Sequence, residues 1–180
     1  EPTVWHLGEG LGFSRPLVDL KVTDDGKRVY ALSEDGTLTA WNAGAGQVEA
    51  IAFLDEPLSY MTFCISQKRG FAFVGDKCGV LYVLSLQDLS VYRKVRAHES
   101  AITKVQLDEA RGILFTVVGD NEVKVWDLND GFRLVKTIQS RNEVMQICLL
   151  EEAGVLLSQL YSSHFYTWDW DSGTDLFYFK

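Results

Sequence analysis

The sequence predicts an all-β domain built from a repeated unit, and three observations lead to this prediction. Short segments in which apolar and polar residues alternate recur along the whole chain of 180 residues. A tryptophan, or a bulky apolar residue in its place, recurs at a nearly constant spacing. Apolar residues do not recur at helical spacing, and glycine interrupts each longer stretch, so helices are not expected.

The repeat is measured most easily on its third strand, which ends near a tryptophan. The residues at this position are Trp5, Trp41, Leu84, Trp126 and Trp168. They are separated by 36, 43, 42 and 42 residues. A period kept over a whole chain is typical of architectures in which each unit buries an apolar face against its neighbours.

Each unit is expected to contain four strands, because β-branched and aromatic residues alternate between turns rich in Asp, Asn and Gly. In the third unit the expected strands are Ile102–Leu107, Ile113–Val118, Val123–Leu128 and Phe132–Ile138. The first strands of the other units are expected to begin near Leu17, Tyr60 and Val144. A turn containing glycine precedes each second strand, at Gly26, Gly70, Gly112 and Gly154.

The period divides the chain into four units and a short remnant. The expected units are residues 17–58, 59–100, 101–142 and 143–180, and residues 1–16 are expected to be the remnant of a preceding unit. An open stack of such units would expose apolar sheet faces at both ends. We therefore expect further units, supplied by the rest of the gene product or by another chain.

The third unit carries the most specific motif. A period of about 40–45 residues, four strands per unit and Trp-Asp closing the third strand resemble the blades of WD-repeat β-propellers. Ala97-His98 stands where that family has Gly-His. The resemblance implies a structural hydrogen-bond network in which His98 bridges the turn residue Asp120 to Thr116, and Thr116 binds the indole N–H of Trp126. A buried indole N–H and a buried carboxylate each need such a partner.

The other units depart from this pattern. The first has Ala31 at the hydroxyl position and no matching histidine, and the second has Cys78 in place of the acid and Leu84 in place of the indole. The fourth has Ser162 in place of the acid but keeps Trp168. Units without the network are expected to depend more on apolar packing between sheets.

Composition excludes several classes of function. The chain has 17 Lys and Arg against 25 Asp and Glu, a net charge of −8, which argues against direct binding to a nucleic-acid backbone. No apolar run approaches the ~20 residues of a transmembrane helix. Three cysteines that stand far apart, Cys64, Cys78 and Cys148, are typical of a reducing compartment. A cytoplasmic protein is therefore expected.

Catalysis is the sharper interpretation of His98, Thr116 and Asp120, since hydrolysis uses these residue types. The structural interpretation is favoured, because the same residues fall in register with a repeat that exists for packing. His6 and His164 have no further ligand at metal-binding spacing. We expect no enzymatic activity, no catalytic residue, no cofactor and no metal.

The resemblance implies a scaffold that binds protein partners within a multi-subunit complex. The candidate contact residues lie before first strands or between second and third strands: Glu34, Lys77, Glu99, Arg141 and Tyr161. The negative charge favours a basic partner. The alternative is a membrane-trafficking or phosphoinositide-linked propeller, for which the basic segment Arg93–Arg96, together with Lys68 and Arg69, is the only visible cluster. We interpret that segment as a solvated edge strand.

The aromatic C-terminal segment is only partly explained by the repeat. Trp168 falls in the indole position, but Trp170, Phe177 and Phe179 have no such role. One interpretation is that they cover an adjacent blade that this chain does not supply.

Overall fold

The structure is a computed structural model of the chain. It describes residues 15–55, 62–119, 121–140, 144–150, 155–160, 165–169, 172 and 174–179. The described residues form strands and turns and no helix, so none of them belongs to a helix that could cross a membrane. The predicted all-β class is confirmed.

Four antiparallel four-stranded sheets make up the described part of the chain, and within each sheet the strands follow one another in sequence order. Sheet 1 contains β1 (Leu17–Val22), β2 (Arg28–Ser33), β3 (Thr37–Asn42) and β4 (Gln47–Phe53). Sheet 2 contains β5 (Phe63–Ser66), β6 (Phe71–Gly75), β7 (Val80–Ser85) and β8 (Val91–Arg96). Sheet 3 contains β9 (Ile102–Asp108), β10 (Ile113–Val118), β11 (Glu122–Asp127) and β12 (Arg133–Gln139). Sheet 4 contains β13 (Val144–Leu150), β14 (Val155–Leu160), β15 (Phe165–Asp169) and β16 (Thr174–Phe179).

The strand predictions for the third unit agree with β9 to β12 to within one residue at each end. The predicted starts at Leu17 and Val144 coincide with β1 and β13. Tyr60 lies outside the described residues, and β5 begins at Phe63.

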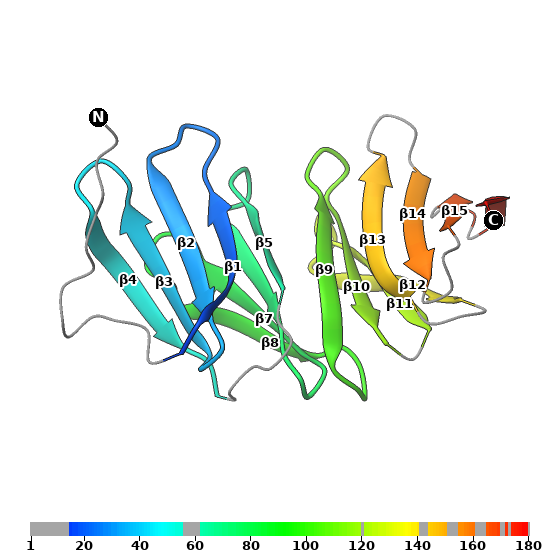
Figure 1. The fold of residues 1–180 in the computed structure, drawn as a ribbon, viewed down its shortest axis with the longest axis horizontal. Coiled ribbons are helices and arrows are strands. Elements are labelled where there is room, and N and C mark those ends of the chain that lie inside the picture. The colour runs from blue at the N-terminus through cyan, green and yellow to red at the C-terminus, as the bar shows by residue number, and fades with distance from the viewer. Residues whose placement is uncertain are drawn as a thin grey trace.

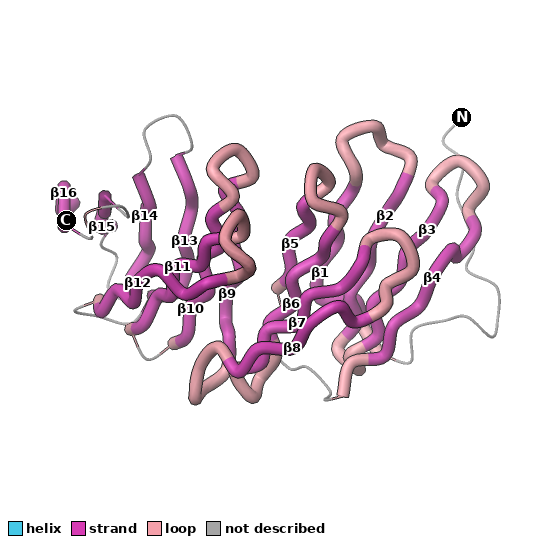
Figure 2. Tube along the Cα trace, turned by 180° about the vertical axis from the view of Figure 1, so that it is seen from behind, coloured by secondary structure: helices cyan, strands magenta, loops and turns pink. Residues whose placement is uncertain are grey.

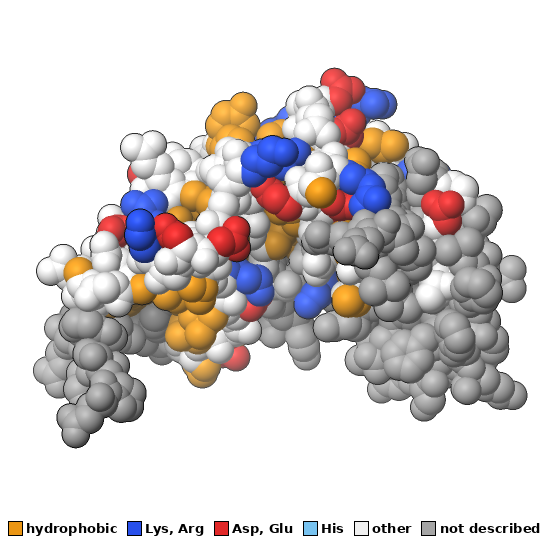
Figure 3. Space-filling view, turned by 90° about the horizontal axis from the view of Figure 1, so that it is seen from above, with side chains coloured by type: hydrophobic (Ala, Val, Ile, Leu, Met, Phe, Trp, Pro, Cys, Tyr) orange, Lys and Arg blue, Asp and Glu red, His pale blue; other side chains and the backbone are white. Residues whose placement is uncertain are grey.

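The sheets stand side by side, with sheet 1 at one end of the row and sheet 4 at the other (Figure 1). The first strands β1, β5, β9 and β13 are neighbours along this row. From behind, the loops of successive sheets gather at the two ends of the strands (Figure 2). Seen from above, the molecule curves into an arch (Figure 3). This arrangement is β-propeller-like.

Apolar cores fill the spaces between successive sheets, as β10 shows most clearly. Ile113, Phe115 and Val117 belong to the core shared with sheet 4. Leu114 and Val118, at alternating positions, belong to the core shared with sheet 2. Because both faces of this strand are covered, each of its residues is buried. Thr116 is thus a fully buried hydroxyl between two apolar layers.

Candidate functional site

The polar centre of the molecule is a chain of hydrogen bonds in sheet 3. The indole Nε1 of Trp126 donates to Thr116 Oγ1 at 2.9 Å. Thr116 Oγ1 lies 2.7 Å from His98 Nε2, and His98 Nδ1 lies 2.7 Å from Glu122 Oε1. The structure therefore brings together His98, Thr116 and Trp126, three of the four predicted network residues. Asp120, the fourth, lies outside the described residues.

The order of donors in this chain follows from the indole, which only donates. Since Thr116 accepts from Trp126, its own O–H is free to donate to His98 Nε2, and His98 Nδ1–H then donates to Glu122. This arrangement requires a neutral imidazole. Burial lowers the pKa of His98 below its ordinary value, although the hydrogen bond with Glu122 acts in the opposite direction. Each polar group in the chain is thus satisfied without a buried positive charge.

Glu122 is the member of this network that sequence reasoning missed. Burial alone would raise its pKa, but the hydrogen bond from His98 and the charge of Lys124 outweigh burial and lower it. Lys124 Nζ lies 3.3 Å from Glu122 Oε1 and also donates to Ala97 O at 2.6 Å. Gln139 Nε2 donates to Glu122 Oε2 at 3.2 Å. The carboxylate therefore joins the loop before β9 to strands β11 and β12.

Gly79 in the β6–β7 turn positions the His98 loop. Its carbonyl accepts the N–H groups of Ala97 and His98 at 2.9 and 3.0 Å. Gly79 has a φ of +82°, and a Cβ on it would lie 2.1 Å from the carbonyl oxygen of His98. Only glycine fits here, because any side chain would collide with the loop backbone.

The first sheet satisfies its tryptophan in another way. Trp41 Nε1 donates to Thr39 Oγ1 at 2.8 Å, and Thr39 Oγ1 donates to the carbonyl of Ala31 at 3.3 Å. Position 31 has no hydroxyl, and Thr39, which lies two residues before Trp41 on the same strand, supplies one instead. Alternate residues of a strand share a face, which is the signal that could have identified Thr39.

The interpretation that the second unit lacks an acid in its tight turn is wrong. Asp76, rather than Cys78, supplies the carboxylate: its Oδ1 accepts the N–H groups of Cys78 and Val80 at 2.8 and 2.7 Å. An aspartate at the first position of a turn reaches these N–H groups as an Asx turn. The acid therefore stands two residues before the position at which it was expected. Burial, with the nearby charge of Asp76, raises the pKa of Tyr82 to about 12.

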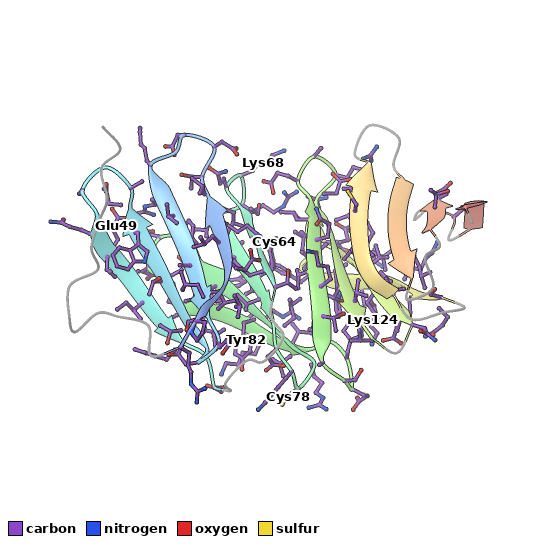
Figure 4. The ribbon with its side chains drawn as sticks, viewed as in Figure 1. Glu49, Cys64, Lys68, Cys78, Tyr82 and Lys124 are labelled. Carbon is purple, nitrogen blue, oxygen red and sulfur yellow. The ribbon has the colours of Figure 1, made fainter. Side chains whose placement is uncertain are left out.

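Three of the predicted contact residues lie in loops at one end of the strands. Glu34 is half-buried in the β2–β3 loop, Lys77 is exposed in the β6–β7 loop, and the Glu99 side chain is 93% exposed in the β8–β9 loop. Figure 4 labels Cys78 at this end and Lys68 at the opposite end of sheet 2. Arg141 and Tyr161 lie outside the described residues.

The basic segment on β8 is engaged by neighbouring groups. Lys94 pairs with Asp55, which follows β4 of sheet 1, and the Lys94 ammonium lies 5.2 Å from the ring centroid of Tyr82. Arg96 pairs with Glu99 at 3.3 Å, and Arg93 donates to Gly131 O at 2.7 Å. These contacts are typical of an edge strand tied to its surroundings.

A cleft of about 340 Å³ lies at the end of the strands where Lys68 is found, opposite the predicted contact residues. Its polar lining comes from β1, β5, β9 and the loops that follow them: Lys21, Asp24, Cys64, Gln67, Lys68, Gln106 and Glu109. Burial raises the pKa of the Cys64 thiol, which disfavours the reactive thiolate. Sequence reasoning missed this cleft, although Asp24, Gln67 and Glu109 share one position of the repeat. Among the described residues no group of three or more potential metal ligands gathers.

The chain is similar to proteins of known sequence and of known structure. No family model matches the sequence. Over 103 residues, or 56% of the chain, the sequence is 28% identical to the mouse (Mus musculus) WD repeat and FYVE domain-containing protein 1, and this stretch is 25% of that protein. The structure is similar to the computationally designed protein Ika8, with a TM-score of 0.77 at 19% identity, over 94% of this chain and 50% of the designed one.

These similarities have a defined extent. The chain spans about a quarter of the curated relative and half of the designed protein. The similarity to the designed protein concerns the fold alone, and the similarity to the mouse protein is to a WD repeat protein.

Proposed function

We propose that this chain is a non-catalytic scaffold that binds protein partners within a multi-subunit complex. The binding surface is the end of the strands that carries the loops of Glu34, Lys77 and Glu99. The observation that carries the proposal is the exposure of charged side chains on loops that backbone hydrogen bonds hold to the sheets. The similarity to a WD repeat protein supports the same class of function.

The loops of this surface are held in place before any partner arrives. The β8–β9 loop is tied to Gly79, and Ile102 N donates to the carbonyl of Asp76 at 2.9 Å. A loop already fixed in one conformation loses little entropy when it binds, so more of its contact energy is available as affinity.

Charge points to a basic partner. The chain carries a net charge of −8, and Glu34 and Glu99 contribute acidic side chains to the surface. A field of one sign speeds the approach of an oppositely charged protein and disfavours like-charged ones.

Burial of the histidine network supports a structural role in place of a catalytic one. His98 is 2% exposed and Thr116 is fully buried. A general base must come within hydrogen-bond distance of its substrate, and these atoms already bind one another inside the protein.

The proposal includes completion of the arch. An arch in which each inner sheet buries both faces leaves one packing face at each end, and further sheets would cover these faces. We propose that such sheets are added when the protein assembles.

The test is capture of partners by the chain and by two variants with equal changes of charge. Glu99→Lys alters the proposed surface, and Asp24→Lys alters the opposite end of the strands. We expect the proteins retained by the unmodified chain to be retained by Asp24→Lys and lost by Glu99→Lys in quantitative affinity purification. Equal retention by the two variants would contradict the proposed surface.

Liposome flotation separates the alternative function, a module linked to phosphoinositides. The exposed basic side chains of β8 are the feature that would favour it. We expect no flotation with vesicles containing phosphoinositides, because Lys94 and Arg96 are already paired with carboxylates. Flotation that disappears in Arg93→Glu would favour the membrane function over the scaffold.

A further inference from the structure

The cleft at the ends of β1, β5 and β9 lies away from the proposed partner surface. Figure 4 labels Lys68 in the loop at this end of the strands and Cys64 further along β5, while the loops of Glu34, Lys77 and Glu99 lie at the opposite end. The volume of the cleft, about 340 Å³, lies near the lower end of the ~300–1,000 Å³ that ligand pockets typically have. The cleft therefore has the size of a site for a small ligand or for the end of a peptide.

Hydrogen bonds between neighbouring sheets hold the loops around the cleft. Gln67 Oε1 of sheet 2 accepts the N–H of Asp24 of sheet 1 at 3.1 Å. Glu109 Oε1 of sheet 3 accepts the Ser66 hydroxyl at 2.9 Å and the N–H of Lys68 at 3.1 Å, both from sheet 2. Because the lining groups are fixed before a ligand arrives, binding costs little ordering of the loops.

The carboxylate of Glu109 can accept further hydrogen bonds. Its Oε2 is buried and has no hydrogen-bond partner in the described part of the structure. A buried acceptor without a donor costs free energy, and such groups are normally paired. The Glu109 side chain is 36% exposed and lines the cleft, so a ligand in the cleft could supply the donor.

The two lysines of the cleft differ in their pairing. Lys21 Nζ donates to both carboxylate oxygens of Asp19, at 2.7 and 2.8 Å, so its charge is neutralised. Lys68 is exposed, and its ammonium pairs with none of the described residues. Since the Lys68 N–H binds Glu109, the Lys68 ammonium and the Glu109 carboxylate are separated by little more than the length of a lysine side chain. An anionic group with an N–H donor beside it would satisfy both.

The charge of the lining favours a singly charged group. Lys21 and Lys68 are balanced by Asp24 and Glu109, so the cleft carries no net charge from its lining. A phosphate, with up to two negative charges, would be repelled by the two carboxylates as well as attracted by Lys68. A single carboxylate that carries its own N–H donor matches this balance better.

Two glutamines and two apolar residues complete the complementarity. Gln67 and Gln106 line the cleft with side-chain amides, which carry the same donor and acceptor as a peptide group. Gln67 uses its oxygen for Asp24, which leaves its NH₂ group to donate to a carbonyl. Ile65 and Leu107 supply apolar surface to the same cleft. The lining thus offers partners for peptide groups and for an apolar side chain.

We propose that this cleft binds the carboxyl end of a peptide. The terminal carboxylate pairs with Lys68, the N–H of the last residue donates to Glu109, and an apolar last side chain lies against Ile65 and Leu107. The preceding peptide groups bind the amides of Gln67 and Gln106. This inference goes beyond the proposed scaffold function, because it concerns a second site at the opposite end of the strands and does not depend on the first.

Affinity selection by the full chain, from a pool of peptides randomised at the carboxyl end, tests the proposal. Peptides enriched over a parallel selection with Lys68→Met are identified by mass spectrometry. The best of them is titrated by fluorescence anisotropy, once with a free carboxyl end and once amidated. We expect the amidated form to bind at least about tenfold more weakly, because it offers Lys68 no negative charge. Lys68→Met should weaken binding of the free acid by the same factor and leave binding of the amide unchanged.

A second variant addresses the carboxylate. Glu109→Gln keeps an oxygen for Ser66 and for the N–H of Lys68 but replaces the other carboxylate oxygen by NH₂, so it should weaken binding of both forms of the peptide. Lys77→Met, the same change of charge as Lys68→Met at the opposite end of the strands, is the matched control and should bind as the unmodified chain does. Unchanged circular dichroism and thermal unfolding of the variants separate loss of binding from loss of fold. If Glu109→Gln does not fold, Lys68→Met at its exposed position decides the test.

Three outcomes would overturn the inference. They are a selection that enriches no peptide over Lys68→Met, equal binding of the free acid and the amide, and a free amino acid that binds as tightly as the peptide ending in the same side chain. Partner capture that depends on Glu99 is measured separately, so the scaffold function can stand in each of these cases.

Discussion

Sheets 1 and 3 both have a tryptophan one residue before the end of the third strand, but the hydrogen-bond partner of the indole differs between them. In sheet 3 the chain from Trp126 runs through Thr116 and His98 to Glu122, and so connects two strands and the loop before β9. In sheet 1 the indole of Trp41 reaches only Thr39 on its own strand.

The difference shows which part of the network the indole itself needs and which part connects a loop to the sheet. Either threonine satisfies an indole N–H, so the tryptophan position does not by itself need the histidine. In sheet 3 the histidine and the glutamate add a connection between the His98 loop and the sheet, which sheet 1 does without. Perturbing equivalent residues should therefore cost more in sheet 3 than in sheet 1.

The largest expected effect comes from removing the two indoles. Trp126 is 6% exposed, and Trp126→Ala is expected to lower the free energy of unfolding by about 3–5 kcal/mol. Trp41 is only half-buried, so Trp41→Ala is expected to cost less. Urea denaturation followed by circular dichroism measures both losses. Equal losses of stability would contradict the expectation that the more deeply buried indole contributes more.

An intermediate effect is expected from the two hydroxyls. Thr116→Val keeps the side-chain shape but leaves the Trp126 N–H without an acceptor and His98 without a donor, and should cost about 1–3 kcal/mol. Thr39→Val leaves an indole that is partly exposed and reaches water, so its cost should be below about 1 kcal/mol. Thr137→Val, at an exposed position of sheet 3, serves as the control in the same denaturation series. A larger loss for Thr39→Val would reverse the comparison.

The smallest expected effect is a dependence of stability on pH, which we expect from His98 in the network of sheet 3. Burial lowers the pKa of His98 below the ordinary 6.5, so the unfolded chain binds this proton more tightly than the folded one. The free energy of unfolding should therefore fall as the pH drops below 6.5, until the lowered pKa of the folded state is passed.

Thermal unfolding between about pH 7 and about pH 5 measures this dependence. His98→Gln should be less stable than the unmodified chain at neutral pH and should lose the dependence in this range. The same slope in His98→Gln would assign the pH effect to other groups. The lowered pKa of Glu122 should add a further loss of stability in more acidic solution, when its carboxylate is protonated.

The strands were predictable because they depend on local patterns. Alternation and glycine turns located β9 to β12 to within a residue, and the period brought His98, Thr116 and Trp126 into one unit. Glu122, Thr39 and Asp76 were not predicted as partners. Their roles depend on how far a side chain reaches across a turn or along a strand, which a period of about 42 residues does not resolve.

The sequence by itself determined the all-β class, the repeat and the place of His98, Thr116 and Trp126 in one unit, because alternation and spacing are properties of the chain. Only the tertiary structure decided how the indoles of Trp41 and Trp126 are satisfied, that Asp76 holds the β6–β7 turn, and that an apolar face of sheet 1 is exposed. These outcomes depend on the curvature of the row of sheets and on distances of a few ångströms between residues far apart in sequence. Hydrogen bonds and packing are sensitive to such distances.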